Sequence, residues 1–599
     1  MASDDLTALR ERLAAVPLSL AELSACAEAI ALLAHDAAAS GAAVRRVAVV
    51  GDLTVQLLER AVACAIAQEG ELPLLYSAPY GMAQQECLDP SSGLHAFCPE
   101  LVVLVPDWRT AVPVLPVDAP AEAVDAASRE QVRMFEAQWA ALESRGYTII
   151  QHLLVPPPLL LRGPAERRSP ASITRRVQSL NELLLEAGTG RVTWLEADRL
   201  AAHLGLGAWS SARFYHAGKL GFDPRFLADY LPWFRGAWRT ATGRTKKLLV
   251  LDLDDTLWGG TIGDDGLDGI ALGPDHGARG EAFAAWQQYL ACLGQRGVVL
   301  AVCSKNAPEV AVTGFDHPAS ALRRGDFAAF VCNWDDKATG LRQIAAELCL
   351  GLEAVVFVDD NAAERSLVQQ LVPPVTVVDV GTDPARFIER LEAGHWFDLQ
   401  AYAQADLQRG ASYAARNAAE ASRSSAADLA SFLAGLQMAG RLVAAQPADL
   451  PRLAQLELKT NQFNLTTRRC SQAQLAANLG QADRLVLACH LKDRFGDHGL
   501  VSCLVAVREG DVLRIDSWLM SCRVLGRTAE HFIMAGLARM AREQGATALV
   551  GEYVATSRNG VVADVYLRLG FEPMGADGRL WSRNLAAPLD DLASPIAAA

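Results

Sequence analysis

The chain has 599 residues, about four times the roughly 150 residues of a typical domain, so a single-module protein is excluded and three to four domains are expected. With 51% apolar and 21% charged residues, its composition is that of an ordinary globular protein, which excludes wholesale disorder. Its net charge of −14 argues against a generally basic nucleic-acid-binding protein, so an anionic partner has to meet a local basic patch.

The first block carries a helical pattern followed by alternating strand and helix patterns. Helical spacing of apolar residues predicts a helical preface over residues 1–40. An apolar strand at Val47–Val50, a helix starting near Thr54 and a second strand at Leu101–Val105 follow it. This order of elements indicates a parallel α/β domain, which we expect to span residues 41–243.

The turn after the first strand, Gly51-Asp52-Leu53-Thr54, resembles the GDS turn of SGNH-type hydrolases, as does the position of the later segment Trp209–Lys219. Leu53 stands where that family has its nucleophilic serine. The hydroxyl of Thr54 could lie at the exposed start of the helix, but a hydroxyl there is more often an N-cap. We therefore expect a degenerate hydrolase-like domain that serves as a scaffold or carrier-docking module, with His216 in a structural role.

The central block contains three nearly continuous apolar strands, each followed by polar residues. They are predicted at Lys246–Leu251, Val298–Val302 and Ala354–Val358. Open α/β sheets place their sites at the carboxyl ends of such strands, so we expect the chemistry of the chain to be concentrated here.

The polar residues after these strands suit phosphate chemistry. Asp252 and Asp254 follow the first strand, so that one carboxylate can attack phosphorus while the other protonates the leaving oxygen. Ser304 and Lys337 would supply a hydroxyl and an ammonium to the phosphoryl oxygens. Each residue alone has a structural alternative, such as a capping turn or a helix cap, but their order at three strand ends favours a common site.

Acidic side chains at these strand ends would also attract Mg²⁺, which shields a phosphate from an attacking carboxylate. The predicted metal ligands are Asp252, Asp254, Asp359 and Asp360, with Asp360 favoured over Asp359 by its position after the strand. The predicted phosphate-binding residues are Thr256, Ser304, Lys305, Asn306 and Lys337.

Together these pieces resemble the haloacid dehalogenase (HAD) superfamily. The resemblance implies that Asp252 is the nucleophile and Asp254 the acid/base, with Ser304 and Lys337 binding phosphate. Only the Gly-rich segment Trp258–Gly266 and one helix separate the first two strand ends, which leaves no room for a cap domain. An uncapped site stays open, so we expect a macromolecular participant.

The strings Leu251–Gly260, Ile262–Gly266, Cys303–Asn306 and Phe357–Arg365 resemble the FkbH-like branch of that superfamily, over about residues 245–585. The resemblance implies that a glyceryl group is recruited from 1,3-bisphosphoglycerate and dephosphorylated. Glyceryl is then delivered as a thioester to the phosphopantetheine arm of an acyl carrier protein, for polyketide or related secondary-metabolite assembly.

This chemistry asks for a thiol that can hold the acyl group. Cys303 is the candidate because it precedes Ser304 at the same strand end, and Lys305 beside it could lower its pKa. The alternative is that Cys303 is a buried strand residue whose side chain alternates away from the site.

The last block combines a strand at Val512–Met520, a turn at Arg523–Thr528 and a helix at Ala529–Gln544. A Gly-containing turn that opens a helix exposes N–H groups to a pyrophosphate. With Tyr566–Phe571 downstream, the block resembles the GNAT acyltransferase fold. Thr528 stands where that family usually has Gly or Ala, which puts coenzyme A binding in doubt.

A polar, aromatic and basic stretch precedes this turn and again matches the FkbH-like pattern. Its arginines would give an acidic carrier or its phosphopantetheine phosphate a local basic patch. The alternative is a solvated loop and helix start. The predicted carrier-binding residues are Asn461, Phe463, Asn464, Arg468, Arg469, Arg523 and Gly526.

The twelve cysteines form no CxxC pair and no zinc-ligand spacing, and the N-terminus has no secretory leader pattern. Apolar runs stay far below the ~20 residues that a membrane span requires. We therefore expect a soluble, cytoplasmic protein with reduced thiols that engages neither membrane nor nucleic acid.

These patterns predict an α/β multidomain protein. Its blocks are a helical preface (1–40), an SGNH-like α/β domain (41–243), a capless HAD domain with a Rossmann-like parallel sheet (244–392), a helical linker (393–440), an α+β GNAT-like domain (441–585) and a flexible tail (586–599). The leading function is glyceryl transfer with dephosphorylation. The alternatives are an Mg²⁺-dependent phosphatase of a small phosphorylated metabolite and a non-catalytic carrier-docking protein.

Overall fold

The structure, a computed structural model, describes residues 2–14, 18–158, 161–400, 433–460, 462–494, 496–521, 524–556, 559–575 and 578–599. The chain divides into two compact units. Unit 1 comprises Met1–Thr242 and Asp398–Ala401, and unit 2 comprises Gly243–Phe397 and Tyr402–Ala599.

Unit 1 is built on a five-stranded parallel sheet with the strand order β2-β1-β3-β4-β5. The strands are β1 (Arg45–Gly51), β2 (Pro73–Ser77), β3 (Leu101–Val105), β4 (Thr148–His152) and β5 (Thr193–Leu195). The helices are α1 (Ala2–Ala14), α2 (Leu20–Ala39), α3 (Gln56–Gln68), α4 (Ala83–Leu88), α5 (Gly93–Phe97), α6 (Trp108–Ala111), α7 (Ala121–Ser144), α8 (Ile173–Ala187), α9 (Ala197–Leu204), α10 (Leu206–Trp209), α11 (Ala212–Gly218) and α12 (Leu227–Ala241).

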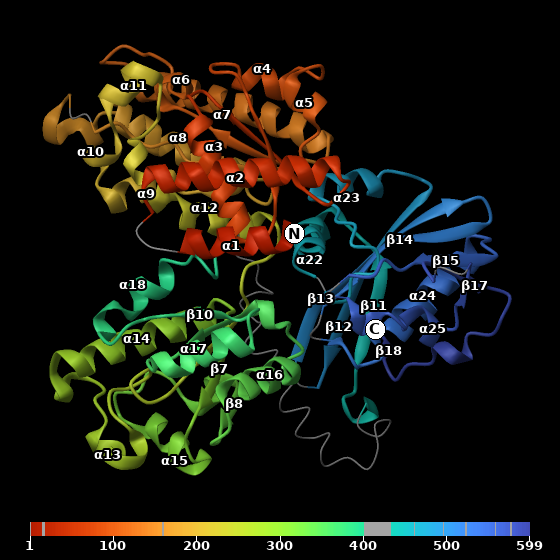
Figure 1. Cartoon of the computed structure of the whole chain (residues 1–599). Coiled ribbons are helices and arrows are strands. Elements are labelled where there is room, and N and C mark those ends of the chain that lie inside the picture. Colours follow the sequence, from red (N-terminus) through yellow and green to blue (C-terminus); the bar gives the residue numbers. More distant parts are fainter. Residues whose placement is uncertain are drawn as a thin grey trace. The chain divides into compact units, whose positions relative to one another are not determined.

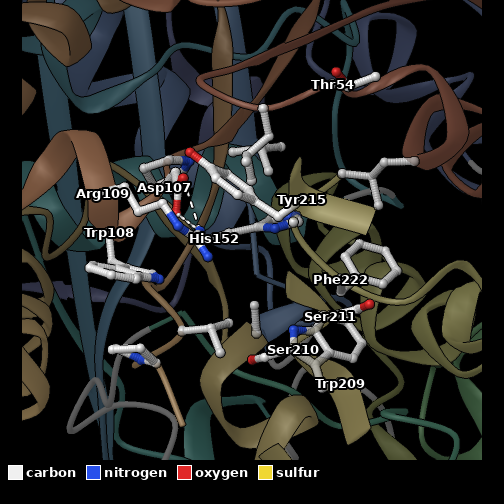
Figure 2. A pocket seen from close by; sticks show the side chains of 18 of the residues that line it. Thr54, Asp107, Trp108, Arg109, His152, Trp209, Ser210, Ser211, Tyr215 and Phe222 are labelled. Atoms are coloured by element: carbon white, nitrogen blue, oxygen red, sulfur yellow. Dashed lines mark hydrogen bonds and ion pairs between the residues drawn. The ribbon is translucent and has the colours of Figure 1, made fainter. Parts of the chain in front are cut away.

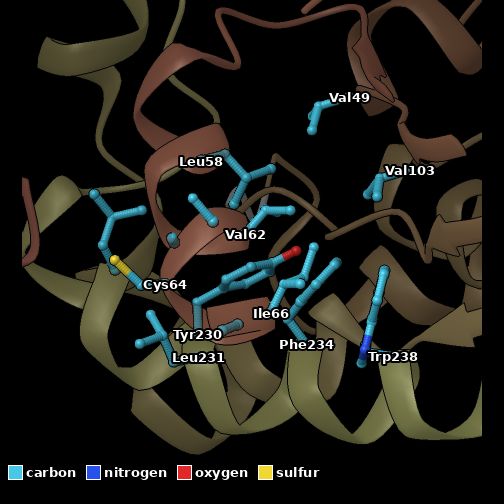
Figure 3. Close-up of a cluster of buried hydrophobic side chains, with 14 of the residues drawn as sticks. Val49, Leu58, Val62, Cys64, Ile66, Val103, Tyr230, Leu231, Phe234 and Trp238 are labelled. Atoms are coloured by element: carbon cyan, nitrogen blue, oxygen red, sulfur yellow. The ribbon is translucent and has the colours of Figure 1, made fainter. Parts of the chain in front are cut away.

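The sheet of unit 1 is covered on both faces, which explains the continuous apolar runs in β1 and β3. Val47 and Val49 of β1 pack into one cluster, whereas Ala48 and Val50 pack into another on the opposite face. In the first cluster, α3 and α12 bring apolar side chains together with those of the sheet (Figure 3). Side chains of α1 and α2 join this cluster, so the predicted helical preface is part of the core of unit 1.

The central part of unit 2 is a second five-stranded parallel sheet, with the order β10-β9-β6-β7-β8 (green in Figure 1). The strands are β6 (Leu248–Leu251), β7 (Val299–Ser304), β8 (Phe327–Cys332), β9 (Val355–Val358) and β10 (Thr376–Val378). The helices are α13 (Ile262–Gly269), α14 (Gly277–Gln295), α15 (Pro308–Thr313), α16 (Lys337–Glu347), α17 (Ala362–Leu371) and α18 (Phe387–Glu392).

No cap domain is inserted between the first two strands of this sheet. Residues 252–298, all of which are described, contain only α13, α14 and the short 3₁₀ helix Pro274–His276. The short spacing in the sequence predicts the absence of an inserted cap domain between these two strands.

The C-terminal part of unit 2 is an eight-stranded mixed sheet with the order β16-β17-β15-β14-β13-β12-β11-β18 (blue in Figure 1). The strands are β11 (Ala439–Ala444), β12 (Arg484–Asp493), β13 (Gly496–Glu509), β14 (Val512–Met520), β15 (Ala548–Glu552), β16 (Glu572–Pro573), β17 (Leu580–Asn584) and β18 (Ala597–Ala598). The helices are α22 (Leu450–Lys459), α23 (Gln472–Leu479), α24 (Ala529–Glu543) and α25 (Val565–Arg568).

Two predicted boundaries differ from the structure or lie outside it. The segment 586–599, expected to be a flexible tail, adds β18 to the sheet in parallel with β11, and Ile596 is buried. Its short apolar residues therefore gain backbone hydrogen bonds and a place in the core. Most of the expected linker, 401–432, lies outside the described residues.

Two further expectations concern the environment of the chain. Every cysteine in the described part is a free thiol. None of the described helices combines the length and the apolar character that crossing a bilayer requires.

Candidate functional site

Three parallel strands of unit 2 bring buried polar residues to one edge of the sheet. Asp252 directly follows β6, which pairs with β7 on one side and with β9 on the other. Ser304 is the last residue of β7, and Asp359 directly follows β9. All three side chains are buried. The three strand ends lie at one edge of the sheet, as the sequence predicts.

Lys337 joins the two aspartates from the start of α16. Asp336 caps this helix by accepting a hydrogen bond from Thr339 N, which fixes Lys337 in the first turn. The ammonium of Lys337 lies 3.0 Å from Asp252 Oδ1 and contacts Asp359 Oδ2. Burial lowers the pKa of Lys337, but the two carboxylates outweigh it and raise the pKa above its usual value. Lys337 is therefore a buried, fixed positive charge.

Asp252, Asp359 and Asp360 form a group with the geometry of a cation site. Each offers a carboxylate oxygen, and these oxygens lie within 4.8 Å of one another. Burial raises the pKa of Asp252 to about 6, opposed by Lys337 and reinforced by Asp359. Burial, with Asp359 and Asp255, also raises the pKa of Asp360. Three carboxylates thus face one ammonium, and oxygen donors with excess negative charge are those that Mg²⁺ prefers.

The carboxylate of Asp254 is held by a different set of partners. Its Oδ1 accepts hydrogen bonds from Trp258 Nε1 at 2.9 Å and from Ile262 N at 3.0 Å. Its Oδ2 accepts one from Asn306 Nδ2 at 2.8 Å. Asp254 is not a member of the carboxylate group described above, so its predicted part as a side-chain metal ligand has no support from this geometry. Its fixed orientation is compatible with the acid/base role, which stays a prediction.

The other predicted phosphate binders take different positions. Ser304 donates a hydrogen bond to Asp252, whose pKa it lowers. The buried hydroxyl of Thr256 accepts a hydrogen bond from Asp360 N at 3.2 Å and so positions that loop. The ammonium of Lys305 pairs with Glu364 Oε1 at 2.5 Å, which directs it to α17. Lys305 is therefore not one of the groups gathered around Asp252.

Cys303 faces the opposite side of the sheet from Ser304. Its side chain is 3% exposed in an apolar cluster beneath α16, with Sγ 3.8 Å from Lys337 O. Burial raises the pKa of the thiol to about 12. A Cβ added to Gly340 would lie 2.6 Å from this sulfur, which shows how closely α16 approaches the strand. The structure thus supports the alternative interpretation, a buried strand residue, rather than an acyl-carrying thiol.

Cys332, which sequence reasoning missed, is the thiol on the same face as Ser304. It ends β8 and is in register with Ser304. Burial raises its pKa to about 12, and the nearby carboxylates of Asp252 and Asp254 contribute to the rise. The available signal was the apolar run Phe327–Cys332, which ends shortly before Lys337. Cys332 thus shares the face of the aspartates, but it is as protonated and nearly as buried as Cys303.

The predicted carrier-binding residues of the C-terminal part are engaged within the fold. Phe463 packs edge-on against Trp518, and Asn464 is buried. Arg468 pairs with Asp516 at 2.8 Å and with Glu552 at 2.7 Å.

Arg469 donates to the backbone oxygens of Glu457 and Leu458. Asn461 and Arg523 lie outside the described residues. Both described arginines, Arg468 and Arg469, are exposed, so their carrier-binding role stays a prediction.

The turn before α24 is closed by the C-terminal segment. Gly526 and Thr528 both have left-handed backbone conformations, with φ of 76° and 57°. The hydroxyls of Thr528 and Ser594 are 3.1 Å apart, and Ser594 Oγ also donates to Thr528 O at 3.2 Å. Ser594 thus contacts the residue whose identity already puts coenzyme A binding at this turn in doubt.

No family model and no curated protein matches the sequence. Among solved structures, the N-terminal part of the protein BF1531 from Bacteroides fragilis, which contains a phosphatase domain and was solved in complex with Mg, is 25% identical, with a TM-score of 0.56. The match covers 64% of this chain and 100% of that one. This chain is thus similar in fold to a protein part that includes a phosphatase domain.

Acetyltransferase structures match a smaller share. The ribosomal-protein-S18-alanine N-acetyltransferase from Escherichia coli is 14% identical over 24% of this chain and 94% of that one, with a TM-score of 0.20. The GNAT domain of S. lividans PAT is 16% identical over 24% of this chain and 90% of that one, also with a TM-score of 0.20. These scores do not bear on the fold of this chain.

Proposed function

We propose that unit 2 is an Mg²⁺-dependent phosphatase and glyceryl transferase. It takes a glyceryl unit from 1,3-bisphosphoglycerate, removes its phosphate and delivers glyceryl as a thioester to the phosphopantetheine arm of an acyl carrier protein. The observation that carries the phosphoryl part is the group of buried Asp252, buried Asp359 and half-buried Asp360, with the Lys337 ammonium against the first two. The similarity to a structure that contains an Mg-complexed phosphatase domain supports it.

The oxygen donors fit Mg²⁺ by type, spacing and charge. Asp252, Asp359 and Asp360 would hold the ion, which offsets phosphate charge that would otherwise repel an attacking carboxylate. Lys337 balances only part of the negative charge of the three carboxylates, which leaves room for a divalent cation.

With the metal ion bound, the side chains of this site would carry out a two-step hydrolysis. A carboxylate oxygen of Asp252 attacks phosphorus, and the bond between phosphorus and the glyceryl oxygen breaks. Asp254 gives its proton to that leaving oxygen. Water then attacks the aspartyl phosphate, Asp254 takes the proton of the water, and inorganic phosphate leaves with Asp252 restored. Lys337 and Ser304 hold the phosphoryl oxygens during both displacements.

The glyceryl and carrier part of the proposal is supported by the four strings that resemble the FkbH-like branch and by the absence of a cap domain within the fully described residues 252–298. The buried position of Cys303 removes one observation that favoured a thioester on this chain. An Mg²⁺-dependent phosphatase acting on a small phosphorylated metabolite is therefore the second candidate. A cytoplasmic location belongs to the same proposal and agrees with the free thiols of the described cysteines.

The test uses the full chain with 1,3-bisphosphoglycerate, Mg²⁺ and a phosphopantetheinylated carrier, and measures the intact mass of the carrier and the release of phosphate. The proposal predicts a glyceryl increment on the carrier. Asp252→Asn should stop hydrolysis of the 3-phosphate ester, so that the carrier either gains phosphoglyceryl, with release of the acyl phosphate alone, or gains no adduct. The exposed Asp316→Asn should behave like the wild type. Phosphate release without any carrier adduct would leave the phosphatase candidate and exclude the transfer.

A further inference from the structure

Unit 1 contains a cavity that the chemistry of unit 2 does not use. Its volume is about 370 Å³, which lies within the ~300–1,000 Å³ typical of small-molecule sites. Residues that follow β1 and β3 line it, including Leu53 and Asp107, together with His152 at the end of β4. The strand order β2-β1-β3 reverses at this point, where open parallel sheets bind their ligands.

One wall of the cavity is aromatic. The rings of Trp209 and Phe222 stack with centroids 4.2 Å apart and planes 11° apart (Figure 2). Trp209 is 3% exposed, so its position is fixed by the core of unit 1. Leu53, Leu58 and Val155 add aliphatic surface to the same cavity. This wall would take the apolar part of a ligand.

The polar side of the cavity is built around Arg109. Its guanidinium carbon lies 3.6 Å from the ring centroid of Tyr215 and 4.6 Å from that of Trp108. Its Nη1 pairs with both carboxylate oxygens of Asp107, at 3.0 and 3.2 Å. Among the residues that the structure describes, neither Nη2 nor Nε of Arg109 has an acceptor. The two aromatic rings thus fix the planar guanidinium of Arg109, whose remaining N–H groups can donate hydrogen bonds to a ligand.

The charges that face this cavity cancel. Asp107 is 5% exposed and compensates the guanidinium of Arg109. His152 is 6% exposed, and burial lowers its pKa to about 3, which leaves its ring neutral. Its Nε2 is 2.9 Å from the hydroxyl of Tyr230, and the other ring nitrogen meets no partner in the described part of the chain. The cavity therefore offers hydrogen-bonding groups with little net charge.

The cavity is not arranged for hydrolysis. Leu53 occupies the position after Asp52, and the hydroxyl of Thr54 makes no hydrogen bond to a histidine within the described residues. Figure 2 shows Thr54 apart from the group formed by Asp107, Arg109 and His152. Thr54 is therefore not paired with a base in the described part of the chain, and the arrangement favours binding.

We propose that this cavity binds a neutral amphipathic carbonyl compound, an amide or a thioester. Its carbonyl oxygen accepts from the unused donors of Arg109, and its apolar chain lies against Trp209 and Phe222. Because Asp107 already balances Arg109, a carboxylate of the same length binds less well. This proposed binding site lies outside the phosphoryl chemistry of unit 2, and the proposal does not depend on that chemistry.

The test is isothermal titration of the full chain with octanamide and with octanoate, which have the same chain length and differ in charge. Octanamide should bind saturably, with a Kd on the order of 1 mM or tighter. Arg109→Gln should weaken it about five- to tenfold, the loss of one or two hydrogen bonds. Because that variant leaves Asp107 without its cation, Phe222→Ala serves as a second variant and should weaken binding by a similar factor.

Arg199→Gln is the matched control, since Arg199 is an exposed residue of α9 that pairs with Glu196 and does not line the cavity. It should bind octanamide like the wild type. The proposal is overturned if octanamide does not bind saturably, if Arg109→Gln and Phe222→Ala both bind it with wild-type affinity, or if octanoate binds more tightly than octanamide.

Discussion

The Lys337 ammonium lies 3.0 Å from Asp252 Oδ1, and both side chains are buried at the carboxyl edge of the central sheet. Lys337 starts a helix and Asp252 follows a strand, so the contact depends on how α16 packs against β7 and β6.

Lys337→Gln should reduce phosphate release at least about a hundredfold, because the phosphoryl oxygens lose a fixed positive charge and Asp252 and Asp359 are left uncompensated. Lys305→Gln is the matched change, since Lys305 pairs with Glu364 and lies outside the group around Asp252. It should keep activity within a few-fold of the wild type. Steady-state phosphate release by both variants tests this, and equal losses would show that Lys305 also contacts phosphate.

Removal of Mg²⁺ by a chelator should abolish phosphate release, and added Mg²⁺ should restore it. Asp360→Asn should weaken Mg²⁺ binding at least about tenfold, because one of three gathered carboxylates loses its charge. Titration calorimetry with Mg²⁺ reads this directly, without an activity assay. Asp316→Asn, a change of the same kind at an exposed position, should leave Mg²⁺ affinity unchanged.

Cys303→Ala should lower the free energy of unfolding by about 1–2 kcal/mol, because it removes a buried sulfur from an apolar cluster. Phosphate release and carrier loading should persist, since the thiol faces away from Asp252. Cys332→Ala is the variant to compare with Cys303→Ala, because the side chain of Cys332 lies on the same face of the sheet as that of Ser304. Loss of carrier loading in Cys303→Ala alone would contradict the buried role assigned to this residue.

Gly340→Ala should lower both stability and activity. The new Cβ would lie 2.6 Å from Cys303 Sγ, so α16 has to move outward and carry Lys337 with it, at a cost of about 1–3 kcal/mol. The double variant Gly340→Ala with Cys303→Ala removes the clashing sulfur and should recover part of the activity. Thermal unfolding and phosphate release of the two single variants and the double variant complete the cycle.

The buried Glu457 should make the stability of the C-terminal part depend on pH. Burial raises the pKa of its carboxyl from 4.5 to about 7, which corresponds to about 3 kcal/mol. Between these two values the folded state keeps a proton that the unfolded chain loses. The free energy of unfolding therefore falls as pH rises through this window and stays lowest above pH 7.

Glu457→Gln removes this contribution, so between pH 5 and pH 8 its unfolding should shift less than that of the wild type. The exposed Glu543→Gln should retain the wild-type shift. Thermal unfolding of the three proteins at both pH values provides the comparison, and parallel shifts in all three would mean that Glu457 is ionised in the folded state.

Much of the fold could be predicted from local pattern. The apolar run Leu101–Val105 coincides with β3, because a strand covered on both faces leaves a continuous signal. The segment Val512–Met520 coincides with β14, whose first half alternates between buried and half-buried residues. The order of Asp252, Ser304 and Asp359 along the chain was enough to place them at one edge, since parallel strands share their carboxyl side.

What could not be predicted depends on contacts between distant segments. Whether Cys303 or its neighbour Ser304 faces the aspartates is decided by the phase of β7, which a short apolar run does not reveal. Lys305 pairs with Glu364 only once α17 is in place. The pairing of β18 with β11 rests on backbone hydrogen bonds that are independent of side-chain type.

The close approach of α16 to β7 gives the buried thiol of Cys303 a mechanical meaning. A sulfur on the strand and a missing side chain at Gly340 together set the gap between helix and sheet. Lys337 stands in the first turn of the same helix. Cys303 is thus a spacer: a larger side chain at this position would displace α16 and Lys337 with it, whereas a smaller one leaves a cavity and costs mainly stability.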